Sequence, residues 1–69
     1  MTADDLRYRL CAFFAANPDE ELTIEDVCVK YDVAPSEAHN ARRLIPPALV
    51  TTERRGRIVH LVAGPELKQ

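Results

Sequence analysis

Residues 23–62, TIEDVCVKYDVAPSEAHNARRLIPPALVTTERRGRIVHLV, decide the fold of this 69-residue chain. Two short segments with apolar residues at helical spacing come first, and Asp32-Val33 separates them. Two runs rich in Val, Ile, Leu and Thr follow, and such runs are typical of β-strands. This order predicts two short helices followed by a β-hairpin.

The same capping signal occurs at two predicted helix starts. Thr2 and Thr23 each precede an aspartate by three residues, Asp5 and Asp26, and a threonine hydroxyl can cap the free N–H groups of a first turn. The predicted helices therefore cover about residues 3–16 and about residues 24–31. Asn17-Pro18 ends the first of them, because proline disfavours helical geometry in the residue before it. Residues 19–21 are expected to form a solvated connector.

A third helix is predicted over about residues 35–45. Proline is favourable in a first turn, as at Pro35, and Pro46-Pro47 cannot continue a helix. Just before this helix, Asp32 tolerates the left-handed conformation that a tight turn needs.

The C-terminal part, about residues 48–62, is predicted to be a hairpin. Its strands are expected at 48–52 and 57–62, with Glu53-Arg54-Arg55-Gly56 between them. Gly56 supplies the positive φ of the turn.

Positive charge is concentrated late in the chain. Residues 1–41 contain nine acids and three bases, whereas residues 42–57 contain five arginines and one acid. The net charge is −2 and the pI about 5.6. Such an asymmetry says more about binding partners than the total charge does.

The composition, 46% hydrophobic and 29% charged, is that of one globular domain. No apolar stretch reaches the roughly 20 residues that cross a bilayer, and the acidic N-terminus does not suit a secretory signal. We therefore expect a cytoplasmic protein. Cys11 and Cys28 lie in helical apolar patterns and are expected to be reduced core residues. No motif indicates an enzyme, a metal site or a cofactor.

With these elements in this order, the chain resembles the winged helix-turn-helix DNA-binding proteins, small transcription regulators of bacteria and phages. Cys28 occupies the position of a small residue four places before the turn residue, Asp32. Val33 takes the hydrophobic position after the turn, and Ala34 replaces the serine that commonly caps the next helix. The resemblance implies one α+β domain over residues 1–69, with three helices and a C-terminal two-stranded hairpin, the wing.

In such proteins the second helix of the motif reads the DNA major groove, and the wing contacts the backbone or the minor groove. The resemblance therefore implies double-stranded DNA as the partner, with no cofactor. The residues it places at the interface are Ser36, Glu37, His39, Asn40, Arg42, Arg43, Arg54, Arg55 and Arg57. The amide of Asn40 suits adenine and the fork of Arg43 suits guanine, whereas Arg42 suits a phosphate.

Other interpretations stay open. A winged helix can be a protein-interaction adaptor without DNA binding, and the acidic first 41 residues favour this alternative. Arginines at a hairpin tip can form a solvated turn, and Arg42 and Arg43 can pair with Asp26 or Glu37. The side of the molecule on which the acids lie would discriminate between the alternatives.

Two further expectations concern the first helix and the histidines. A lone winged helix with about five interface arginines should bind DNA weakly, so useful specificity needs a dimer on two half-sites or cooperative arrays. The first helix is the candidate for the self-association surface. Its large apolar residues are Leu6, Tyr8, Phe13 and Phe14. His39 is expected to be exposed on its helix, and His60 to be a packing or edge residue of its strand.

Overall fold

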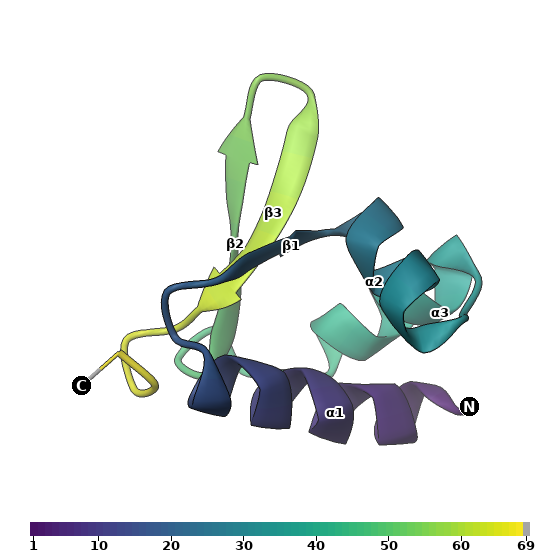
Figure 1. The fold of residues 1–69 in the computed structure, drawn as a ribbon, viewed down its shortest axis with the longest axis horizontal. Coiled ribbons are helices and arrows are strands. Elements are labelled where there is room, and N and C mark those ends of the chain that lie inside the picture. Colours follow the sequence, from purple (N-terminus) through teal and green to yellow (C-terminus); the bar gives the residue numbers. More distant parts are fainter. Residues whose placement is uncertain (69) are drawn as a thin grey trace.

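The computed structural model describes residues 1–68 and shows helices and strands mixed along the chain (Figure 1). The helices are α1 (Ala3–Ala16), α2 (Ile24–Tyr31) and α3 (Pro35–Arg43). The strands are β1 (Glu21–Thr23), β2 (Val50–Arg55) and β3 (Ile58–Ala63). Over these residues the fold is α+β, with three helices and one three-stranded antiparallel sheet in the order β1-β3-β2.

The sheet has three strands and not the two that the sequence predicts, because β1 also belongs to it. The sequence predicts residue 21 in a connector and Thr23 at a helix start, but residues 21–23 pair with β3. Leu22 lies opposite Leu61, and Thr23 opposite His60. A strand of three residues is too short to show the alternation that identifies strands in a sequence. Its pairing makes β3 the central strand.

Both predicted capping boxes are present. In α2, the Asp26 N–H donates to Thr23 Oγ1 at 3.1 Å, and the Thr23 N–H donates to Asp26 Oδ2 at 3.0 Å. In α1, the equivalent bonds between Thr2 and Asp5 measure 3.2 and 3.5 Å. These four bonds satisfy N–H groups that the first turn of a helix cannot use. Both helices span the predicted ranges.

The turn between α2 and α3 takes the predicted left-handed conformation. Asp32 has φ 54° and ψ 56°, and the N–H of Val33 returns to the carbonyl of Cys28 at 3.2 Å. This bond closes the C-terminus of α2 in the manner of a Schellman motif. The end of α3 differs from the prediction by two residues. Leu44 donates to the Ala41 carbonyl, a tighter turn that ends the helix at Arg43.

The core lies between the helices and one face of the sheet. Alanines 38 and 41 are fully buried, and such small side chains let α3 pack closely on α1 and α2. The largest fully buried side chains are Leu6, Leu10, Phe14, Val27 and Leu61. Both cysteines are free and half-buried against this core. Among the helices of residues 1–68, none has the length and apolarity needed to cross a membrane.

The hairpin of β2 and β3 projects away from α1 (Figure 1). The strand β2 reaches further toward the turn than predicted, because Arg54 and Arg55 belong to it and lie opposite Val59 and Ile58. The connection is thus a two-residue turn, Gly56 and Arg57, rather than the four residues expected. Gly56 has φ 62°, as predicted, and a glycine at this position suits a type II′ hairpin turn.

Candidate nucleic-acid interface

The outer face of α3 carries the polar residues that the sequence singled out. Ala38 and Ala41 point into the core, so the side chains about half a turn away point outward. Ser36, Asn40 and Arg43 are exposed. Glu37, His39 and Arg42 are half-buried at the border of this face.

His39 and Arg42 interact one turn apart on α3. Arg42 Nε donates to His39 Nδ1 at 3.3 Å. His39 was expected to be simply exposed, but it is half-buried and turned toward the hairpin. The bond leaves the terminal nitrogens of Arg42 to other partners.

A groove of about 490 Å³ separates α3 from the hairpin. The N-terminus of α2 forms its third side. Its lining residues are Thr23, Ile24, Glu25, His39, Arg57, Ile58 and Val59. The groove therefore joins two predicted site residues from distant parts of the chain, His39 and Arg57. The other lining residues were not predicted, because only the packing of α2 against the hairpin brings them here.

The hairpin presents its arginines on opposite faces. Arg54 lies opposite Val59, which points to the same sheet face as the fully buried Leu61, and directly paired residues share a face, so Arg54 lies on the face toward the core. Arg55, the next residue, therefore points to the other face. Arg54 Nε donates to the Gly56 carbonyl at 3.4 Å. No ion pair within residues 1–68 involves Arg54 or Arg57.

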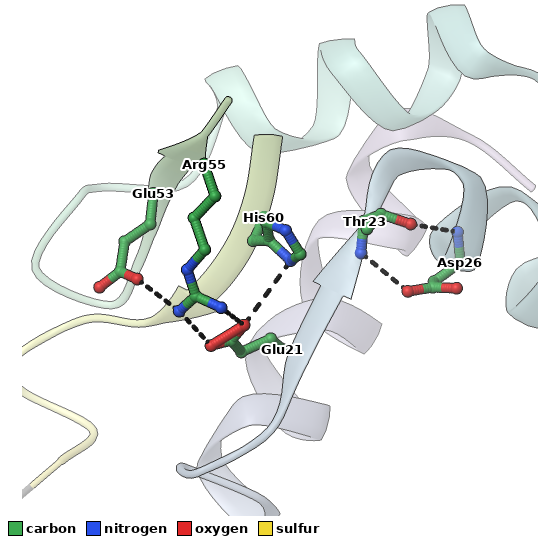
Figure 2. Close-up of polar contacts among 6 residues, drawn as sticks. All are labelled: Glu21, Thr23, Asp26, Glu53, Arg55 and His60. Carbon is green, nitrogen blue, oxygen red and sulfur yellow. Dashed lines mark hydrogen bonds and ion pairs between the residues drawn. The ribbon is translucent and has the colours of Figure 1, made fainter. Parts of the chain in front are cut away.

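Arg55 belongs to an ion-pair cluster with Glu21 and Glu53 (Figure 2), on the sheet face opposite the one that carries the buried Leu61. Its Nη1 and Nη2 donate to the two carboxylate oxygens of Glu21 at 2.7 and 2.6 Å, and Nη2 also donates to Glu53 at 3.0 Å. His60 Nδ1 lies 3.6 Å from Glu21 Oε1. The hydrogen bonds from Arg55 hold the pKa of Glu21 below its ordinary value. Its ion pairs distinguish Arg55 from Arg54 and Arg57, which form none within residues 1–68.

The acids are divided between the groove and other surfaces. Arg42 and Arg43 form no ion pair with Asp26, Glu37 or any other acid within residues 1–68. The carboxylate of Asp26 is used by the cap of α2. Glu25, however, lines the groove that also contains Arg57. The positive charge on this side is therefore reduced but not cancelled.

Most of the apolar residues expected to make a dimer contact on α1 are used inside the protein. Leu6 and Phe14 are fully buried, and Phe13 packs edge-on against Phe14. Tyr8 is 68% exposed, with the Arg7 guanidinium over its ring. Of the four named residues, Tyr8 is thus the one left on the surface. Residues 1–68 contain no cluster of three or more His, Cys, Asp and Glu side chains that could hold a metal ion.

No protein-family model, curated protein or solved structure matches this chain.

Proposed function

We propose that this protein is a winged helix-turn-helix domain that binds double-stranded DNA and regulates transcription. In this proposal α2, the Asp32 turn and α3 form the helix-turn-helix, and the β2–β3 hairpin is the wing. The proposal is supported by the order of the elements and by the left-handed turn between the two helices. The exposed face of α3 supplies groups for base edges, with Asn40 suited to adenine and Arg43 to guanine.

One observation supports the proposal more strongly than any other observation does. The groove places Arg57 at the hairpin turn across from His39 on α3, so the two elements border one continuous surface. A duplex that receives α3 in its major groove would then meet Arg57 and Arg54 along the adjacent backbone. These arginines have no ion-pair partner within residues 1–68, so phosphates would not have to displace one.

An NMR titration of the ¹⁵N-labelled protein with a mixed-sequence duplex at low salt tests this function. We expect shifts in residues 36–43 and 54–58 that added salt reverses. Replacing Arg57 by Ala should weaken binding to all duplexes and reduce the slope of log K against log salt by about 0.9. The matched control is Arg9→Ala, an exposed cation of α1. A spectrum that the duplex does not change would reject the proposal.

A second candidate function, a protein-interaction adaptor, is favoured by the composition of the groove. Ile58 is 53% exposed beside the groove, and Ile24 and Val59 also line it. Glu25 would repel a phosphate there, whereas a protein partner could pair with it. This alternative predicts a partner that wild-type protein captures and an Ile58→Asp variant does not. It also predicts that DNA leaves the NMR spectrum unchanged.

A further inference from the structure

The outer end of the hairpin has little support from the sheet itself. The strand β1 pairs with β3 only at His60, Leu61 and Val62. Beyond Thr23, the pairs Arg54–Val59 and Arg55–Ile58 form a two-stranded ribbon with no third strand beside it. Two-stranded ribbons are marginally stable in water, so another contact is needed to hold this end in one orientation.

The pair of Glu21 and Arg55 provides such a contact. Glu21 lies at the start of β1, whereas Arg55 lies at the end of β2, and β3 runs between them. The Arg55 side chain extends across β3, past His60, to reach the Glu21 carboxylate (Figure 2). Two parallel hydrogen bonds fix both the distance and the plane of the guanidinium, and Glu53 adds a third. The end of the ribbon is thereby tied to the strand that leads directly into α2.

We propose that Glu21 and Arg55 are positioning residues that hold the wing in the orientation needed for DNA. The inference rests on the proposed function, since it names the residues that orient one of its two contact elements. Arg55 acts through the wing and not on phosphate, because its guanidinium already donates to two carboxylates. A wing that is ordered before binding loses less conformational freedom when it meets the DNA.

The sign of one substitution separates positioning from simple electrostatics. Glu21→Gln removes a negative charge, so long-range electrostatics alone predicts tighter binding to DNA. If Glu21 positions the wing, the same change weakens binding by about two- to tenfold, the range expected when side chains must be ordered on binding. Glu20→Gln is the matched control, because the neighbouring acid is exposed and forms no ion pair within residues 1–68.

A second variant, at the other residue of the pair, tests the same inference. Arg55→Lys keeps the charge but cannot form the bidentate pair. A positioning residue should lose affinity on this change, in the same range as Glu21→Gln, whereas a phosphate ligand should tolerate it. Affinities of the three variants and the wild type would be measured by fluorescence anisotropy with one duplex at one salt concentration.

The free protein supplies a measurement that does not depend on DNA. Heteronuclear NOE values and amide exchange rates of residues 54–59 report the order of the wing end. We expect lower NOE values and faster exchange in Glu21→Gln and Arg55→Lys, with Glu20→Gln unchanged. An unchanged wing in both variants, or a loosened wing with unweakened DNA binding, would overturn the inference. If the wild type binds no DNA, the proposed function fails, and the free-protein data still show whether the pair orders the hairpin.

Discussion

The helix N-termini and the sheet are stabilised by contacts that differ in sequence separation. Each capping box joins residues three apart, Thr2 with Asp5 and Thr23 with Asp26. In the sheet, Arg55 binds a carboxylate 34 residues away at Glu21. A local contact stabilises one element wherever that element lies. A long-range contact fixes how elements are arranged, so its loss should affect the whole domain or its binding surface.

The largest effect is expected at Gly64, where the backbone lies directly against the segment that precedes β2. The N–H of Gly64 donates to the Leu49 carbonyl at 2.7 Å, and a Cβ at this position would overlap the backbone of Pro47 and Ala48. The hydrogen bond keeps the two segments from separating. Gly64→Ala should therefore lower the free energy of unfolding by about 3 kcal/mol, which chemical denaturation would measure.

Gly56→Ala is the control that separates overlap from backbone strain. Gly56 has φ 62°, but a Cβ there would meet no atom within 4 Å. The cost should be about 1–2 kcal/mol, because the left-handed conformation alone is unfavourable for alanine. If Gly56→Ala lowers the free energy of unfolding as much as Gly64→Ala does, or more, overlap with the backbone of Ala48 is not the main cost of a side chain at Gly64.

The two capping boxes give the next effect, and they should differ although their residues match. Thr23→Ala should cost about 1 kcal/mol of unfolding free energy, because Thr23 caps α2 and is also the last residue of β1 in the sheet. Thr2→Ala should cost about 0.5 kcal/mol or less, since its capping bonds are longer, at 3.2 and 3.5 Å, and Thr2 belongs to no strand. Denaturation of both variants, with Thr23→Ser as the conservative control, would measure the difference. Equal losses would show that the sheet contact adds nothing at Thr23.

This division by range also explains what the sequence could and could not predict. The capping boxes, the Asp32 turn and the ends of α1 and α2 depend on residues a few places apart, and all were predicted. The strand β1 was missed because its pairing with Leu61 is not visible in three residues.

The candidate site also has a part that the sequence could predict and a part that it could not. The outward face of α3 follows from helical spacing around Ala38 and Ala41. The groove beside it and the pairing of Arg55 with Glu21 depend on tertiary packing, so neither could be predicted from the sequence.

A smaller effect, of opposite sign, is expected at the turn between α2 and α3. Asp32 occupies the left-handed region without being a glycine, which costs free energy in the folded state. Asp32→Gly removes that cost but gives the unfolded chain more freedom, so the net gain should be about 0.5 kcal/mol. Asp32→Ala should instead destabilise the protein. A rise in the denaturation midpoint for Gly and a fall for Ala would support this explanation, and destabilisation by Gly would refute it.

The smallest effect should be the contribution of one local carboxylate to acid unfolding. The pKa of Asp26 is held below its ordinary value by two hydrogen bonds with Thr23. The bond from the Thr23 backbone has the larger effect, and the bond with the Thr23 side chain the smaller. A carboxyl whose pKa is lower in the folded than in the unfolded state stabilises the protein above its unfolded pKa. That stabilisation is lost as the pH falls through the folded value, between about pH 5 and pH 2.

Asp26→Asn isolates this contribution, because the amide does not titrate. The unfolding free energy of the variant should be lower at pH 6 and should fall less between about pH 5 and pH 2 than that of the wild type. Urea denaturation at a series of pH values would give both slopes, with Asp19→Asn as a control in the exposed segment after α1. Glu21→Gln should also flatten the profile, since the pKa of Glu21 is lowered by Arg55. If Asp26→Asn leaves the slope unchanged while Glu21→Gln flattens it, acid sensitivity belongs to the long-range pair and not to the local cap.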